Sequence, residues 1–124
     1  MDVVYEALKI LKLVLQARAP YDTGNLAINS IRIVGNAVYI GGEIADYAIY
    51  TNEPWVSEKF HGAKNPNEGW VQAAIQEAAP IIQRVLSGKA TQTDINAVQD
   101  LYKNVIADRK NRLVENLKQL RDEI

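Results

Sequence analysis

The stretch SIRIVGNAVYIGG, residues 30–42, decides the fold class of this chain. Gly35 and Asn36 form a two-residue turn of the kind that tolerates positive φ angles, and apolar side chains alternate with other residues on both sides of it. These alternating apolar side chains are Ile31, Ile33, Val38 and Ile40. A period of two is the signature of a strand, so the stretch predicts an antiparallel β-hairpin in a chain that otherwise favours helices.

The segment before the hairpin, residues 2–18, has the period of an amphipathic helix. Its expected apolar stripe consists of Val4, Ala7, Leu8, Leu11, Val14 and Leu15. Pro20 ends this helix, because a proline ring disfavours the helical conformation of the residue before it. A second, short helix is expected over residues 24–29, with Asp22 or Thr23 as its N-cap.

Two helical segments are predicted directly after the hairpin. A short helical turn is expected within ADYAIYTNE, residues 45–53. A longer helix covers residues 68–87, with Asn67 as its N-cap and Gly88 as its C-terminal stop. Pro80 lies inside this helix and is expected to kink or break it.

The C-terminal segment predicts a long charged helix over residues 94–123, with Thr93 as its N-cap. Its expected apolar stripe is Ile95, Val98, Tyr102, Val105, Ile106, Leu113, Leu117, Leu120 and Ile124. About thirty helical residues extend about 45 Å, whereas a domain of this size is roughly 30 Å across. Part of the helix is therefore expected to project or to pack on another subunit. The prediction is an α+β core over residues 1–92 with a helical extension over residues 93–124.

Residues 53–67 are rich in Pro, Gly and Asn and predict a loop. The stretch from 52 to 70 holds both tryptophans, the only phenylalanine and the only histidine. Aromatic side chains on such a loop either pin it to the domain or anchor an interface, where tryptophan is enriched. The interface candidates are Trp55, Phe60, His61, Trp70 and Tyr50. Trp70 opens an amphipathic helix and therefore also fits the core, so Trp55 is the better interface candidate.

Composition excludes several classes of protein. The 124 residues point to one domain, and 48% of them are apolar, which argues against global disorder. The net charge of −1 argues against a dedicated nucleic-acid binder and against electrostatic membrane docking. There is no cysteine, which excludes disulfides and thiolate chemistry. No run of about 18 apolar residues predicts a membrane-spanning helix, and the N-terminal segment lacks the features of a secretory signal.

Catalysis has one candidate centre. His61 is the only histidine, and it would need a partner such as Glu58 or Glu68. None of these residues stands in a recognisable catalytic or metal-binding frame, and no cofactor or metal is expected. A small hydrolase-like enzyme therefore remains an alternative function.

The basic stretch DRKNR, residues 108–112, supports a second alternative, a DNA-binding regulatory module that uses the C-terminal helix. Its candidate phosphate contacts are Arg109, Lys110 and Arg112. A solvated helix face, or ion pairs with Asp108 and Glu115, explains the same residues without DNA.

Several segments together resemble a family of small phage proteins. They are APYDTGNLAINSI at 19–31, VYIGG at 38–42, ADYAIYTNE at 45–53 and GWVQAAIQEAAPII at 69–82. Their order and spacing are similar to those of the head–tail joining or tail-completion proteins of long-tailed bacteriophages and prophages. The resemblance covers about residues 17–87, and the helix from residue 93 onward departs from the pattern.

The resemblance implies a structural neck component without catalytic activity. It implies a ring of copies, expected to be a hexamer, whose partners are the capsid connector or head-closure protein and the tail tube protein. DNA would be only passing cargo, no membrane is involved, and the protein would be made in the host cytoplasm and reside in the virion. The residues that match the family's motif imply fold-defining roles for Pro20, Asp22, Thr23, Gly24, Leu26, Ser30, Tyr47 and Ala48.

Overall fold

The computed structural model describes residues 2–20, 25–42, 48–57 and 62–123 of the chain. Over these residues it has an α+β fold in which helices dominate and two small antiparallel hairpins supply the β-structure. In chain order the elements are α1 (Val3–Arg18), the π-helical turn η1 (Asn25–Asn29), β1 (Arg32–Val34), β2 (Ala37–Tyr39), α2 (Ala48–Asn52), β3 (Val56–Ser57), β4 (Ala63–Lys64), α3 (Trp70–Leu86) and α4 (Gln92–Glu123).

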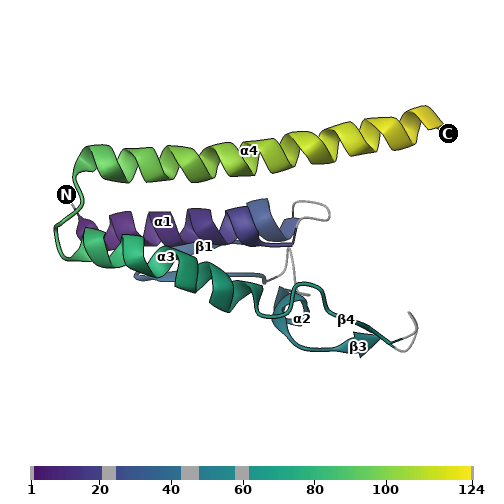
Figure 1. Cartoon of the computed structure of the whole chain (residues 1–124), viewed down its shortest axis with the longest axis horizontal. Helices are drawn as coiled ribbons and strands as arrows, with labels where there is room; N and C mark the ends of the chain where they lie inside the picture. The colour runs from purple at the N-terminus through teal and green to yellow at the C-terminus, as the bar shows by residue number, and fades with distance from the viewer. Residues whose placement is uncertain (1, 21–24, 43–47, 58–61, 124) are drawn as a thin grey trace.

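Helix α1 is the centre of the fold. It packs against α3 and α4, and it also contacts η1 and both strands of the first hairpin. Figure 1 shows α4 along one side of α1, running in the same direction, and α3 on the other side, running in the opposite direction. The core cluster draws mainly on α1, α3 and the first half of α4. The second half of α4 extends past the end of α1 (Figure 1).

The predicted N-terminal helix is present, but its buried face differs from the predicted stripe. Its buried apolar side chains are Ala7, Ile10, Val14, Leu15 and Ala17. Ile10 lies outside the predicted stripe yet is fully buried, whereas Val4 belongs to the stripe and is 44% exposed. The predicted stripe is confirmed at Ala7, Val14 and Leu15, but it is too narrow, because α1 is enclosed by α3, α4 and the first hairpin, which together bury more of the helix than one stripe.

The first hairpin confirms the prediction from residues 30–42. Strands β1 and β2 pair in antiparallel fashion, with Ile33 opposite Val38. Gly35 in the connecting turn has a φ of 59°, which is the left-handed conformation that glycine adopts without strain. On the outer face the guanidinium of Arg32 lies 5.7 Å from the ring centroid of Tyr39. This cross-strand contact adds to the backbone ladder of the hairpin.

The segment predicted as a loop over residues 53–67 contains a second hairpin, so that prediction is wrong in part. Strands β3 and β4 pair with Val56 opposite Lys64 and Ser57 opposite Ala63. Two residues per strand are too few for an alternation of side chains to stand out in the sequence. The short helical turn predicted before this segment is present as α2.

Helix α3 begins at Trp70, and the predicted N-cap, Asn67, does not cap it. Gly69 occupies the N-cap position with a φ of 76° and has no side chain to accept a hydrogen bond. Instead, the side-chain oxygen of Asn52, at the end of α2, accepts the N–H of Val71 at 2.9 Å. The cap comes from a distant part of the chain, which the local sequence does not reveal.

Two predictions concern the C-terminal half of α3. The helix continues through Pro80, so the break expected as one of two outcomes there does not occur. The helix ends at the predicted stop, Gly88, which has a φ of 74°. The N–H of Gly88 donates to the carbonyl of Val85 at 3.1 Å, and the N–H of Lys89 donates to the carbonyl of Arg84 at 2.9 Å. This pair of bonds is the Schellman motif, which satisfies the last carbonyls of a helix.

The long helix α4 begins two residues earlier than predicted, and its N-cap is Thr91, not Thr93. The hydroxyl oxygen of Thr91 accepts the N–H of Asp94 at 3.1 Å, and the carboxylate of Asp94 accepts the N–H of Thr91 at 3.1 Å. This reciprocal pair is a capping box. Hydrogen bonding to the carboxylate of Asp94 by the backbone N–H of Thr91, and after it by the Thr91 side chain, holds the pKa of Asp94 below its ordinary value, and the nearby Arg84 charge adds to the effect.

Candidate interaction surface

The two tryptophans have opposite environments. Trp70 is 7% exposed, and its indole N–H donates to the hydroxyl of Thr51 at 2.9 Å. Trp55 is 41% exposed and lies on the segment between α2 and β3. The remaining interface candidates, Phe60, His61 and the side chain of Tyr50, lie outside the described residues. Trp70 therefore belongs to the core of its own chain, and Trp55 is the surface candidate.

A buried asparagine fixes the segment that carries Trp55. Asn65 is 6% exposed, and its amide nitrogen donates to the carbonyls of Thr51 at 2.9 Å and Glu53 at 2.7 Å. Its side-chain oxygen accepts the N–H of Asn67 at 2.9 Å, and its own N–H donates to the carbonyl of Trp55 at 3.1 Å. Because these bonds tie both hairpin strands to the end of α2, Trp55 is held on an ordered platform.

The described members of the predicted fold-defining motif lie in or beside the core. Leu26 and Ala48 are buried, and Pro20 is half-buried. Ser30 is fully buried, and its hydroxyl donates to the carbonyl of Leu26 at 2.6 Å, which satisfies the side chain inside η1 and its C-terminal turn. The short helix predicted over residues 24–29 is this turn. The members outside the described residues are Asp22, Thr23, Gly24 and Tyr47.

One polar cluster joins the three long helices. The phenolic hydroxyl of Tyr102 in α4 donates to Glu77 of α3 at 2.6 Å, and Arg18 of α1 donates to the same carboxylate at 3.0 Å. Burial raises the pKa of Tyr102 to about 12, and the hydrogen bond to the Glu77 carboxylate adds to the rise. Burial also acts to raise the pKa of Glu77, but the bonds from Tyr102 and Arg18 outweigh it, so this pKa lies below its ordinary value. Both shifts stabilise neutral Tyr102 beside ionised Glu77.

Two of the three basic residues considered for DNA, Arg109 and Arg112, have partners inside the chain. The Arg109 guanidinium donates to the carbonyls of Gln16, Ala17 and Ala19, where α1 ends. It therefore caps the C-terminus of α1, where carbonyls lack partners within the helix and a positive charge is favourable. Arg112 pairs with Asp108, one turn earlier, at 3.0 Å. The contact between Arg109 and α1 could not be predicted from local sequence, because it joins residues about 90 positions apart.

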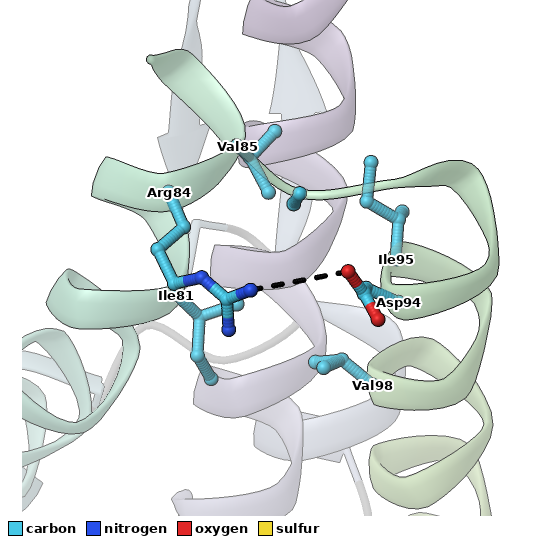
Figure 2. A pocket seen from close by; sticks show the side chains of 7 residues that line it. Ile81, Arg84, Val85, Asp94, Ile95 and Val98 are labelled. Carbon is cyan, nitrogen blue, oxygen red and sulfur yellow. Dashed lines mark ion pairs between the residues drawn. The ribbon is translucent and has the colours of Figure 1, made fainter. Parts of the chain in front are cut away.

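A small hollow between α3 and the start of α4 is lined mainly by apolar side chains. Figure 2 shows Ile81 and Val85 from α3 opposite Ile95 and Val98 from α4, with the ion pair between Arg84 and Asp94 spanning the gap at 3.9 Å. Its volume is about 50 Å³, far below the several hundred Å³ of a typical ligand pocket. The hollow is a packing gap between two helices and not a substrate site.

The second half of α4 exposes Leu117 and Leu120 and leaves Leu113 half-buried, whereas the first half of the helix buries Ile95 and Tyr102. Leu113 and Leu120 follow Ile95 and Tyr102 by 18 residues each, which is five turns at 3.6 residues per turn, so they face the same side of the helix. Ile95 is 2% exposed and Tyr102 6%, whereas Leu120 is 58% exposed. We call residues 110–123 the arm, and Leu113, Leu117 and Leu120 the leucine stripe.

The arm makes no polar contact with the body among the residues that the structure describes. Arg109 is the last residue of α4 to bond α1, and the ion pairs that follow it stay within the helix. The apolar side chains of α4 that pack on the core end at Ile106. Leu117 is 56% exposed. The leucine stripe is therefore an apolar helix face without a partner in the described part of the chain.

Described residues of the body also line two more open hollows. The lysine groove, about 240 Å³, is lined by Tyr5, Lys9, Lys12, Leu13, Ile33, Gln99 and Lys103. The α2 hollow, about 380 Å³, is lined by Ile40, Ala48, Ile49, Asn52, Glu53 and Val71. Ile49 is 62% exposed, the highest value among the large hydrophobic side chains that the structure describes.

Two of the three candidate catalytic residues lie outside the described part of the chain. Glu68, one predicted partner of His61, is exposed in the turn before α3, and the other, Glu58, lies outside the described residues together with His61. Over residues 2–20, 25–42, 48–57 and 62–123, three or more potential His, Cys, Asp or Glu ligands do not come together as they would around a metal ion. Among the helices in the same ranges, none has the length and apolar character needed to cross a membrane.

Comparisons of the chain with protein-family models, with curated proteins and with solved structures found no match.

Proposed function

We propose that this protein is a structural subunit of the neck of a long-tailed phage or prophage. Copies assemble into a ring, expected to be a hexamer, that joins the capsid connector to the tail, and the chain performs no catalysis. The observation that carries the proposal is the leucine stripe, because a helix that continues past the body with its apolar face exposed supports association.

Burial of the leucine stripe against a partner supplies enough free energy to contribute to association. Full burial of a leucine side chain is worth about 1.5–3 kcal/mol relative to full exposure. Leu117 and Leu120 are each more than half exposed, so their burial against a partner offers roughly 2–3 kcal/mol together. A helix with one apolar face commonly binds by lying in a groove of its partner. Trp55 on its ordered platform offers a second anchor of the kind enriched in interfaces.

The resemblance of residues 17–87 to head–tail joining proteins supports a neck component over other kinds of assembly. In this proposal, the ring contacts the connector or head-closure protein on one side and the tail tube protein on the other. DNA passes through the ring as cargo, and the protein resides in the virion after synthesis in the host cytoplasm. The near-zero net charge suits a subunit whose surface mostly meets protein.

The proposal is tested by light scattering of the purified chain across a concentration range, with negative-stain images of the same samples. We expect the mass to rise from that of one 13.8 kDa chain to a discrete multiple, with annular particles in the images. A mass that stays at one chain at every concentration contradicts self-assembly. Unbounded growth into fibres contradicts a closed ring.

A further inference from the structure

We propose that the lysine groove binds an acidic segment of a partner protein, one that carries apolar side chains among its carboxylates. The groove lies on the body, where α1, β1 and α4 each contribute to its walls. All of its lining residues belong to one copy of the chain, and none of them belongs to the leucine stripe. The inference therefore goes beyond self-association and does not depend on it.

The groove presents two lysine ammonium groups that have no carboxylate partner among the described residues. Lys9 of α1 pairs with Glu6 at 2.9 Å and lies 5.0 Å from the ring centroid of Tyr5. Lys12 of α1 and Lys103 of α4, by contrast, form no ion pair with any residue that the structure describes. Two positive charges from two different helices therefore remain available to an anionic partner.

The carboxylates around the groove do not compensate these two lysines. Three carboxylates lie within four positions of a lining residue, and one of them, Glu6, is the partner of Lys9 and also accepts the side-chain amide of Gln99 at 3.2 Å. Asp2 is the N-cap of α1, and Asp100 is exposed and does not line the groove. The hairpin stretch 30–42 contains no Asp or Glu. Every lining residue lies at least four positions from the nearest residue that the structure leaves undescribed.

The apolar part of the lining favours a peptide over a nucleic acid as the occupant. Leu13 of α1 and Ile33 of β1 line the groove together with the lysines, and both are half-buried. An apolar side chain of a peptide would cover this surface, whereas a nucleic-acid backbone presents only phosphates and sugars. Binding to phosphates also draws on many cations, but the chain has a net charge of −1, and Arg109 and Arg112 are engaged within it. The groove therefore fits carboxylates placed around an apolar side chain.

The dimensions of the groove suit a short segment of a partner. Its volume is about 240 Å³, below the roughly 300–1,000 Å³ of pockets that enclose a small molecule. Helix α1 packs against α4 and contacts β1, so the walls are already in place before binding and the entropic cost of docking is lowered. Lysine side chains lay their aliphatic stems along apolar surface and keep their ammonium groups in water, where carboxylates can reach them.

The test measures the binding of labelled probes to the purified chain by fluorescence anisotropy at low salt. The first probe is a short peptide of glutamates interrupted by leucines. The second peptide has glutamine for each glutamate, the third has serine for each leucine, and the fourth probe is single-stranded DNA. The groove variant carries Lys12→Gln and Lys103→Gln. The matched control carries Lys89→Gln and Lys118→Gln, which remove the same charge from two exposed lysines outside the groove.

We expect the first peptide to bind the wild type and the control equally and the groove variant about tenfold more weakly, since each of two ion pairs contributes about threefold. The second and third peptides should bind the wild type more weakly than the first, and added salt should weaken the contact. A variant with Lys12→Arg and Lys103→Arg keeps both charges and should bind like the wild type, which separates loss of charge from loss of fold.

Three results would overturn the proposal. The first is no binding of the first peptide, or equal binding by the groove variant and the control. The second is tighter binding of the DNA than of the first peptide, which would assign the groove to nucleic acid. The third is loss of self-association in the groove variant without peptide binding by the wild type, which would assign the groove to a second copy. A wild type that binds the peptide and stays monomeric contradicts the proposed ring and supports this inference.

Discussion

Replacing Tyr102 by Phe isolates the hydrogen bond that joins α4 to α3. The ring stays in the core, and only the hydroxyl that donates to Glu77 at 2.6 Å is lost. A hydrogen bond to a charged group contributes about 1.5–3 kcal/mol. The Glu77 side chain is 34% exposed and keeps Arg18 as a partner at 3.0 Å, so the low end applies. We expect the free energy of unfolding to fall by about 1.5 kcal/mol.

The two pKa shifts also predict how the effect of Tyr102→Phe on stability changes with pH. Between pH 10, the ordinary pKa of tyrosine, and about pH 12, its value in the folded chain, the native state holds the Tyr102 proton and the unfolded state has lost it. Stability from this group is therefore complete below pH 10 and falls as the pH rises towards 12. Glu77 has a lowered pKa, so its contribution is lost as the pH falls below its ordinary value of 4.5. The advantage of the wild type over Tyr102→Phe should be greatest between these limits.

Urea unfolding followed by circular dichroism at pH 4, 7, 9 and 11 measures this difference. Tyr39→Phe is the matched control, because Tyr39 is 50% exposed and its contact with Arg32 involves only the ring. We expect the control to change stability by less than about 0.5 kcal/mol. Equal stability of Tyr102→Phe and the wild type at pH 7, or a difference that does not shrink above pH 10, would refute the reasoning.

Three further predictions concern other contacts of the fold and surface. Arg109→Ala leaves the last carbonyls of α1 without their donor and should lower the free energy of unfolding by about 2 kcal/mol in urea melts; an unchanged midpoint removes Arg109 as the cap. Gly88→Ala places a side chain at a φ of 74°, with open space around the new Cβ, and should lower the free energy of unfolding by about 1 kcal/mol because of backbone strain. A variant more stable than the wild type would contradict the expected backbone strain. Trp55→Ala should weaken association by about 2 kcal/mol in sedimentation equilibrium with the unfolding transition unchanged; equal association removes Trp55 from the interface.

Local signals in the sequence predicted the elements whose causes are local. The Gly35-Asn36 turn and the alternating apolar residues around it were sufficient to predict the first hairpin. Gly88 was sufficient to predict where α3 ends. The prediction failed where the cause is distant. Asn52 caps α3 from 19 positions away, and the burial of Ile10 depends on which elements surround α1. Neither can be inferred from spacing alone.

The candidate surface was predicted only in outline. The length of the C-terminal helix was enough to predict that part of it projects beyond the body, and the exposure of Leu117 and Leu120 agrees with that expectation. The sequence could not assign Trp70 to the core and Trp55 to the surface with certainty, because the hydrogen bond from Trp70 to Thr51 forms only in the folded chain. The α2 hollow joins three separate elements, so no single stretch of sequence predicts it.

Sedimentation equilibrium of the wild type beside Leu120→Ser and Leu101→Ser tests the central claim, self-association through the leucine stripe, most directly. The two leucines are 58% and 59% exposed on the same helix, but only Leu120 lies on the stripe. We expect the wild type and Leu101→Ser to associate equally and Leu120→Ser to associate about tenfold more weakly, which corresponds to about 1.4 kcal/mol per contact. Equal masses for all three proteins at every concentration would contradict the account.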